Sequence, residues 1–498
     1  MALIQITDLT FTYSGSFDPV FEHVSFQLDT DWRLGLTGRN GRGKTTLLRL
    51  LQGQYPHQGT ITAPGGFEYF PYPIPDAALT PLELLECSFP DVPQWRLRRE
   101  LAPLFVTDDA LYRPFSTLSG GEQAKILLAL LFAREGRYLL IDEPTNHLDE
   151  TGRALVSRYL AKKSGFLLVS HDRAFLDGCV DHILSINRGG IEVQKGNFSS
   201  WYENRQRQDA FELAQNAQLK KEIGRLKQAA RQSRAWADKV ESTKIGPHSA
   251  KVTGEADAMG GRAYIGEQSR RMQQRRKNLE RRQNAAIEEK SALLKNIEQA
   301  APLKLHQLPY HTDRLALLRD VSVCYGGAPV CRGVSFCVEQ GDRIALRGAN
   351  GTGKTSLLRL LCGEDVPHTG TVERSSRLRI SYVRQDPSGL RGDLGAYAAR
   401  YGLDESLFKA ILRKLDFARV QFEKDMADFS AGQKKKVLLA RSLCEPSHLL
   451  VWDEPLNYVD VLSRMQIEDL LLEFQPTIVF VEHDRVFCDH VATKAVML

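Results

Sequence analysis

LGLTGRNGRGKTTLLRLL, residues 34–51, joins a short apolar run to a leucine-rich run through a glycine-rich loop. The loop has the spacing G-x-x-x-x-G-K-T, in which backbone N–H groups surround phosphate oxygens at the start of a helix. Lys44 can neutralise the β- and γ-phosphates, and the Thr45 hydroxyl can bind Mg²⁺. A single match is common by chance, but here the apolar strand before the loop and the helix after it are both present. The stretch therefore predicts an α/β unit that binds a nucleotide.

The same loop returns at residues 348–356, GANGTGKTS, and each copy is followed by the same series of motifs. A serine-glycine signature segment comes first, then an apolar run ending in Asp-Glu, and then an apolar run ending in histidine. The first glycine precedes the signature serine by 81 residues in one copy and by 82 in the other. The Asp precedes the His by 29 and 30 residues. The motifs are LSGGEQ (118–123), RYLLIDE (137–143) and GFLLVSHD (165–172), then FSAGQKKK (429–436), HLLVWDE (448–454) and IVFVEHD (478–484). Such an ordered repeat predicts two nucleotide-binding units in tandem.

The acids at the strand ends suit phosphate chemistry. An aspartate that ends a strand beside the loop can hold Mg²⁺ through water, and the acid after it can act as general base on an attacking water. The aspartates are Asp142 and Asp453, and the candidate bases are Glu143 and Glu454. A lone histidine is more often a core or surface residue. At the end of this series, His171 and His483 are predicted to sense the γ-phosphate.

Composition excludes several classes of protein. The chain has 498 residues, of which 42% are hydrophobic and 26% charged, as in globular proteins with more than one domain. Its first residues, MALIQITDLTFTY, do not resemble a secretory leader, and no run of 18 apolar residues occurs. The eight cysteines include no C-x-x-C pair, which favours a reducing cytoplasm and argues against zinc or an iron-sulfur cluster.

Residues 201–300 carry the positive charge of the chain. They hold 21 Lys+Arg and 13 Asp+Glu, a net of +8, whereas the rest of the chain sums to −3. Apolar residues recur there in two seams, the first at alternating steps of four and three, which predicts two long helices, with a tip near 240–266, in an antiparallel hairpin. The seams are Leu219, Ile223, Leu226 and Ala230, then Met272, Leu279, Ala286, Leu293 and Ile297. A solvated linker is the plain interpretation, and an arm laid against RNA is the functional one.

Taken together, these motifs resemble the ATP-binding cassette (ABC) superfamily. Two cassettes in one chain, no membrane segment, an intact EPTNHLD at 143–149 and a charged helical linker resemble its ABC-F group. The opening WRLGLTGRNGRGKTTLLRLLQ (32–52), the degenerate FSAGQKKK and the EPLNYVD at 454–460 resemble the Lsa/Vga-like antibiotic-resistance branch. The resemblance implies two α/β nucleotide-binding domains at 1–196 and 306–498, joined by the hairpin linker at 197–305.

In this family the cassettes face head to tail, so the resemblance implies that each ATP lies between the loop of one and the signature of the other, within a monomer. Tyr13 and Tyr325 would stack on adenine, although packing is the usual role of an aromatic near a strand end. The implied ATP-binding residues are Tyr13, Gly38, Asn40, Gly41, Gly43, Lys44, Thr45 and Thr46 with Ser430 and Gly432, and Tyr325, Gly348, Asn350, Gly351, Gly353, Lys354, Thr355, Ser356 and Gln385 with Ser119, Gly120 and Gly121. The implied Mg²⁺ ligands are Thr45, Asp142, Thr355, Gln385 and Asp453.

The two copies also depart from each other. Tyr72 stands where the second copy has Gln385, and a phenol cannot reproduce an amide oxygen beside Mg²⁺. Ala431 replaces a signature glycine, and Tyr458-Val459 replaces the His-Leu of the first copy. We therefore expect two unequal sites that both hydrolyse ATP.

The function implied is that of a cytoplasmic ATPase bound in the exit (E) site of the 70S ribosome, contacting 23S rRNA and the P-site tRNA. Its linker tip would displace lincosamides, pleuromutilins and streptogramin A from the peptidyl-transferase centre. A housekeeping factor that relieves stalled ribosomes is the alternative. The ATPase subunit of a drug exporter would need a membrane partner and would leave the basic linker without a role. DNA-repair ATPases are disfavoured, because they carry zinc-type cysteine clusters or much longer coiled coils.

Overall fold

The computed structural model describes residues 2–14, 19–146, 148–187, 190–243, 307–325, 328–417 and 419–498, with six single residues between 274 and 305. Residues 244–266 of the predicted tip, the second apolar seam and His147 lie outside the described residues. The chain divides into one compact unit, made of residues 1–201 and 300–498, and a second unit at 202–299. Within the described residues, no helix combines the length and the apolar character needed to cross a bilayer.

The first half of the compact unit contains two sheets. A three-stranded antiparallel sheet has the order β2-β1-β4, and a six-stranded sheet has the order β5-β6-β7-β3-β8-β9. The strands of the larger sheet are parallel except that β9 runs antiparallel to β8. The strands are β1 Leu3–Phe11, β2 Phe21–Asp29, β3 Arg33–Thr37, β4 Gln58–Thr62, β5 Phe67–Phe70, β6 Tyr138–Asp142, β7 Phe166–Val169, β8 His182–Asn187 and β9 Gly190–Lys195.

The second half repeats this plan. Its antiparallel sheet has the order β11-β10-β13, and its parallel sheet has the order β14-β15-β16-β12-β17. The strands are β10 Arg314–Tyr325, β11 Ala328–Glu339, β12 Arg343–Arg347, β13 His368–Arg374, β14 Ile380–Val383, β15 Leu449–Asp453, β16 Ile478–Val481 and β17 Lys494–Met497. Since β5-β6-β7-β3-β8 of the first half corresponds strand for strand to β14-β15-β16-β12-β17 of the second, with β9 added only in the first, the predicted pair of tandem α/β P-loop units is confirmed.

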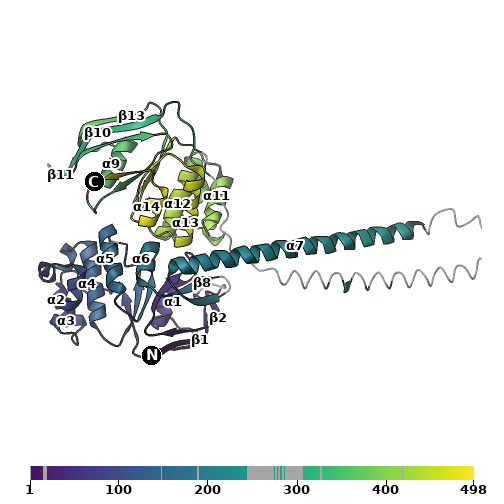
Figure 1. Ribbon diagram of the computed structural model, residues 1–498, viewed down its shortest axis with the longest axis horizontal. Coiled ribbons are helices and arrows are strands. Elements are labelled where there is room, and N and C mark those ends of the chain that lie inside the picture. The colour runs from purple at the N-terminus through teal and green to yellow at the C-terminus, as the bar shows by residue number, and fades with distance from the viewer. Residues whose placement is uncertain are drawn as a thin grey trace, which may run out of the picture. The chain divides into compact units, whose positions relative to one another are not determined.

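Helices divide each half into two lobes. In Figure 1, α2, α3 and α4 gather away from β1 and β2, and α11, α12 and α13 gather away from β10 and β13. The helices are α1 Lys44–Leu51, α2 Pro81–Ser88, α3 Gln94–Leu101, α4 Gly120–Ala133, α5 Glu150–Leu160 and α6 Arg173–Cys179, then α9 Lys354–Cys362, α10 Leu394–Arg400, α11 Glu405–Lys414, α12 Ala431–Cys444, α13 Val461–Phe474 and α14 Arg485–Val491.

The apolar runs of the sequence form the cores that hold these elements. Leu34 of β3, Leu47 of α1 and Leu167 of β7 are fully buried in one cluster of the first half. Burying a leucine side chain contributes roughly 1.5–3 kcal/mol, so the loop between β3 and α1 is anchored at both ends. Helices α4 and α12 pack an apolar face on the sheets, which fixes where their N-terminal ends lie.

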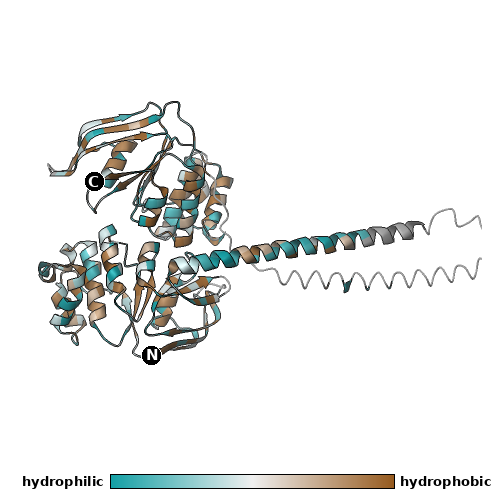
Figure 2. Cartoon of the chain, in the orientation of Figure 1, coloured by the Kyte–Doolittle hydropathy of each residue, from teal (hydrophilic) through white to brown (hydrophobic). Residues whose placement is uncertain are grey.

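Helix α7, Phe198–Thr243, forms the start of the predicted linker. It is one continuous helix, and Figure 2 shows it mainly hydrophilic with a few apolar positions. Ile223 is buried and Leu219 and Leu226 are half-buried, while most of their neighbours are exposed, as the seam predicts. The helix extends to Thr243, four residues into the predicted tip at 240–266.

Candidate functional site

Each glycine-rich loop closes on its own lysine. The lysines Lys44 and Lys354 begin α1 and α9, and the preceding Gly43 and Gly353 adopt the left-handed φ values of 88° and 86°. Lys44 Nζ donates to the backbone carbonyl oxygen of Gly38 at 2.6 Å, and Lys354 Nζ donates to that of Gly348 at 2.8 Å. Burial lowers the pKa of both ammonium groups. These loops are therefore preformed phosphate-binding turns, each with a buried cation at a helix N-terminus.

The strand-end aspartates lie beside the threonines of these loops. Thr45 Oγ1 donates to Asp142 Oδ2 at 3.4 Å, and Thr355 Oγ1 donates to Asp453 Oδ1 at 3.3 Å. Asp453 Oδ2 is buried without a hydrogen-bond partner in the described part of the chain. A hydroxyl beside a carboxylate with a free oxygen is a donor set that suits Mg²⁺. Thr355 and Asp453, predicted to hold the ion beside Lys354, therefore fit it.

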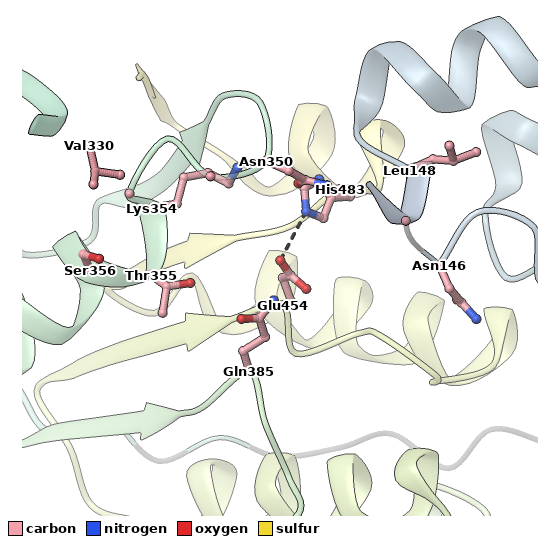
Figure 3. Close-up of a pocket in the computed structure, with 13 residues that line it drawn as sticks. Asn146, Leu148, Val330, Asn350, Lys354, Thr355, Ser356, Gln385, Glu454 and His483 are labelled. Carbon is pink, nitrogen blue, oxygen red and sulfur yellow. Dashed lines mark hydrogen bonds and ion pairs between the residues drawn. The ribbon is translucent and has the colours of Figure 1, made fainter. Parts of the chain in front are cut away.

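We call the site of the Lys44 loop the first site and that of the Lys354 loop the second. A cavity of ≈ 480 Å³ marks the second site, and the first half contributes Asn146 and Leu148 from the opposite side (Figure 3). It is lined by Gly120, Asn146, Leu148, Val330, Asn350, Gly351, Gly353, Lys354, Thr355, Ser356, Gln385, Glu454 and His483. The predicted residues Ser119, Gly121, Tyr325, Gly348 and Asp453 lie outside this lining. The cavity nevertheless brings together the loop of one half and the signature segment of the other.

Glu454 is held by three side chains at the second site. His483 Nε2 lies 3.2 Å from Glu454 Oε1, and Asn457 Nδ2 donates to Oε2 at 2.6 Å. Figure 3 shows Gln385 and His483 pointing toward this carboxyl group. Burial raises its pKa, but hydrogen bonds from His483 and Gln385 outweigh that effect and lower the pKa to about 2. Glu454 is therefore an ionised, oriented carboxylate, as a general base requires.

Glu143 occupies the corresponding position at the first site, but its surroundings differ. His171 Nε2 lies 3.3 Å from Glu143 Oε1, yet that oxygen has no hydrogen-bond partner among the described residues. Burial, and next the charge of Asp142, raises the pKa of Glu143 to about 8. At neutral pH this carboxyl group is therefore largely protonated in the nucleotide-free chain.

Tyr72 stands where the second half has Gln385. Its ring packs on Phe89, with the ring centroids 4.9 Å apart. Tyr69 instead reaches the strand-end aspartate, because its hydroxyl donates to Asp142 Oδ2 at 3.0 Å. A phenol thus occupies one oxygen of Asp142, and the first site has no counterpart of the Gln385 amide.

Both glutamates have backbones in the left-handed region. The φ angle is 49° at Glu143 and 46° at Glu454. Such a conformation costs a non-glycine residue roughly 1–3 kcal/mol and persists where the surroundings enforce it. The backbone amide of each glutamate still donates to the neighbouring strand. Glu143 N donates to Val169 O of β7 at 2.9 Å, and Glu454 N donates to Val481 O of β16 at 3.0 Å. No sequence pattern predicts this backbone conformation.

The signature segments begin helices. Ser119 and Ser430 are the N-caps of α4 and α12, and each forms a capping box with the third helical residue, Glu122 or Gln433. At the first site, Asn40 Nδ2 donates to Tyr458 O at 2.9 Å. A Cβ on Gly432 would lie 2.5 Å from Tyr458 O and 3.3 Å from Asn40 Nδ2. The loop of the first half therefore meets the signature helix of the second at its glycine, as predicted.

The aromatics predicted to stack on adenine lie beside the loops. Tyr13 OH is 2.7 Å from Thr46 Oγ1, and Tyr325 OH is 3.0 Å from Ser356 Oγ. Both rings are exposed rather than packed in the core. The arrangement is the same in the two halves, and stacking on adenine stays a prediction.

Several residues of the site were not predicted. Asn146 and Leu148 belong to the quoted EPTNHLD motif, so their place in it could have indicated them. Val330 and Tyr69 carry no sequence signal. Tyr69 reaches Asp142 because β5 pairs with β6 in the register Tyr69 to Leu140.

The contacts between the two halves are unequal. Arg173 of α6 pairs with Glu468 of α13, both side chains less than a tenth exposed, and Glu468 Oε1 also lies 2.6 Å from His490 Nδ1. The counterpart of Arg173 is Arg485, which pairs with Glu150 at 3.8 Å where both side chains are exposed. Ser157 and Gly178 stand where the second half has Glu468 and His490, and they line a cavity of ≈ 380 Å³ that His483 also lines. The ion pair of Arg173 is therefore buried in this interface, whereas the ion pair of Arg485 is exposed beside a cavity.

Comparisons with known proteins agree with this geometry. A family model described as ABC transporter matches residues 21–68 and 331–457. The ribosome protection protein VmlR of Bacillus subtilis (strain 168) is 26% identical, over 99% of this chain and 86% of its own. The ATP-binding protein Uup of Caulobacter vibrioides is 29% identical, over 96% of this chain and 75% of its own. The probable ATP-binding protein YheS of Escherichia coli (strain K12) is 27% identical, over 94% and 74%.

Solved structures share the tandem fold of this chain. An archaeal ribosome recycling factor, aABCE1, crystallised with the stalk protein aP1, superimposes with a TM-score of 0.62 at 18% identity. The alignment covers 98% of this chain and 87% of that one. A structure titled RNase-L Inhibitor gives a TM-score of 0.58 at 20% identity, covering 93% and 82%. At these identities the likeness concerns the fold alone.

Proposed function

We propose that this chain is a tandem ATP hydrolase of the ABC-F group of the ATP-binding cassette family, and that it acts in the cytoplasm as a ribosome-bound factor. The observation that carries the proposal is the similarity to the ribosome protection protein VmlR, which extends over 99% of this chain, linker included. The net charge of +8 on residues 201–300 supports it, because a basic helical segment favours a polyanion such as RNA.

The chain's own residues account for hydrolysis. At the second site, Lys354 and the helix N-terminus hold the phosphates, and Glu454 takes the proton from the water that attacks the γ-phosphorus. As that bond forms, the bond to the bridging oxygen of ADP breaks and ADP leaves with the electron pair. Mg²⁺, held through Thr355, Asp453 and Gln385, would supply neutralisation of the developing phosphate charge. The other half completes the cavity with Gly120, Asn146 and Leu148, so ATP joins the two halves and hydrolysis lets them separate.

The finer proposal concerns antibiotics. Bound in the E site, the linker would direct residues 240–266 toward the peptidyl-transferase centre, shift the P-site tRNA and release lincosamides, pleuromutilins and streptogramin A. VmlR, a ribosome protection protein, supports this use of the tip over the housekeeping alternative. No membrane subunit or DNA has a role in this proposal.

Ribosome binding is tested with the Glu143→Gln/Glu454→Gln protein, which should retain ATP and remain closed. We expect 70S ribosomes to be recovered with it in ATP and lost in ADP. Recovery of free protein in both nucleotides would contradict the proposal. The wild-type protein, which turns ATP over, is the control.

The antibiotic role is tested by replacing residues 254–264 with a short Gly-Ser link. We expect ATP hydrolysis and ribosome recovery to persist while the minimum inhibitory concentrations of the three drug classes fall to those of the susceptible host. Full protection by the shortened protein would exclude a role for the tip. Ribosome binding without protection by the intact protein would favour the housekeeping factor.

A further inference from the structure

The signature helix α12 has one end at the first site. It begins at Ala431, capped by Ser430, and Gly432 lies against Tyr458 O and Asn40 of the opposite loop. A nucleotide bound by the Lys44 loop therefore meets the start of α12. Helix α12 is a rigid element whose buried face is packed on the sheet of the second half. A shift of its first residues therefore moves the rest of the helix.

One turn further along the same helix, Lys435 reaches the second site. Its side chain is fully buried, and its Nζ donates to Arg384 O at 2.9 Å and to Asp453 O at 3.4 Å. Arg384 directly precedes Gln385, and Asp453 directly precedes Glu454. A single ammonium group thus holds the backbone in front of two residues that face the second cavity.

Lys435 is not a general feature of the cassette. Five residues after the signature serine the first half has Ala124, and directly before the histidine it has Ser170 where the second half has Glu482. Glu482 is buried, and it accepts hydrogen bonds from His483 N at 2.9 Å and Leu456 N at 3.2 Å. A buried lysine and a buried acid therefore occur together in one half and are both absent at the matching positions of the other.

Electrostatics explain why the lysine is held firmly. A buried ammonium group is costly unless it is hydrogen-bonded and faces negative charge. Burial lowers the pKa of Lys435 to about 8, while the surrounding carboxylates, Glu482 first, oppose that change. Loss of this ammonium group would remove a hydrogen-bond donor from two backbone carbonyls and a positive charge that attracts Glu482.

We propose that Lys435 is a positioning residue that couples the nucleotide at the first site to hydrolysis at the second, by tying helix α12 to the backbone in front of Gln385 and Glu454. The coupling runs in one direction, since Ala124 offers no such contact from α4 to the first site. It concerns the ATPase reaction itself and is independent of whether the chain acts on ribosomes.

The test separates the two sites. In a Glu143→Gln background only the second site hydrolyses ATP, and in a Glu454→Gln background only the first does. We expect Lys435→Met with Glu482→Gln to lower kcat at the second site by about tenfold or more, because small displacements of catalytic groups are costly. KM should change by less than about threefold, since Lys354 and the loop are untouched, and kcat at the first site should stay within about twofold.

Controls keep the result interpretable. Lys434→Met removes a neighbouring positive charge on the same helix and should leave both backgrounds unchanged. If the methionine variant does not fold, Lys435→Ala with Glu482→Ser is used instead, because the first half has alanine and serine at these positions, Ala124 and Ser170. An equal loss at both sites would show that Lys435 only supports the helix, and no loss at either would show that its carbonyl contacts do not matter; each result overturns the proposal. All rates are measured without ribosomes, so failure here leaves the proposed function intact.

Discussion

The two candidate bases end equivalent strands with the same left-handed turn, yet they are chemically different. Glu454 is ionised because His483, Gln385 and Asn457 all contact its carboxyl group. Glu143 is held neutral by burial and by Asp142, and one of its oxygens lacks a hydrogen bond. A shared motif therefore fixes the position of a catalytic group, whereas its neighbours decide its protonation state. The first site needs a further event, such as nucleotide binding, to prepare its base.

We expect the largest effect when both bases are removed. The remaining rate of ATP hydrolysis is the baseline against which the two sites are compared. Glu143→Gln/Glu454→Gln keeps the shape of the site but leaves no carboxylate to accept the proton. We expect steady-state ATP hydrolysis to fall by roughly 10²–10⁴-fold, the usual contribution of a general base. ATP binding, measured by equilibrium dialysis, should persist. Unchanged turnover would show that these glutamates are not the bases.

The unequal interface provides the next comparison. Arg173→Met leaves Glu468 buried without its arginine, which we expect to destabilise the closed state by about 3 kcal/mol. This corresponds to a loss on the order of a hundredfold in the ATP affinity of the closed Glu143→Gln/Glu454→Gln protein. Arg485→Met is the matched variant on the other side, where the pair is exposed, and it should cost less than about 1 kcal/mol. Equal losses from the two variants would contradict the asymmetry.

Single replacements of the bases sharpen the comparison of the sites. At pH 7 we expect Glu454→Gln to reduce turnover about tenfold more than Glu143→Gln, because only about one tenth of a group with a pKa near 8 is ionised there. Since a base must be deprotonated to act, kcat/KM of Glu454→Gln should rise from pH 6, reach about half its maximum near pH 8 and level off above about pH 9. The same parameter for Glu143→Gln should stay flat, as the pKa of Glu454 is about 2. Identical pH profiles would show that the two bases are equivalent.

The smallest expected effect concerns the tyrosine at the first site. Tyr69→Phe removes the hydrogen bond to Asp142, which we expect to lower kcat/KM in the Glu454→Gln background by about fivefold, close to 1 kcal/mol. Tyr382→Phe, the corresponding change on β14, is the control in the Glu143→Gln background and should have no such effect. A matching loss there would mean that both tyrosines act through packing.

Much of the fold followed from short-range patterns. The loops at Lys44 and Lys354 lie between a strand and a helix because the apolar residues on either side have the periods of those elements. Strand ends at Asp142 and Asp453 could be placed for the same reason. The prediction that the two sites are unequal followed from Tyr72 and Ala431. The structure supports inequality through other residues, since Tyr72 packs on Phe89.

The sequence by itself determined the duplication, the order of the motifs and the basic middle segment, because each can be read from residue types and their spacing, whereas the pairing of loop with signature segment was implied only by the family resemblance. Only the tertiary structure decided the protonation of Glu143 and Glu454, the hydrogen bond from Tyr69, the one-sided contact of Arg173 and the reach of Lys435. Each of these depends on which side chains meet across strands, helices and halves of the molecule, and burial and distance fix their energies. Contacts between residues far apart in the chain carry no local pattern, so no reading of spacing could have revealed them.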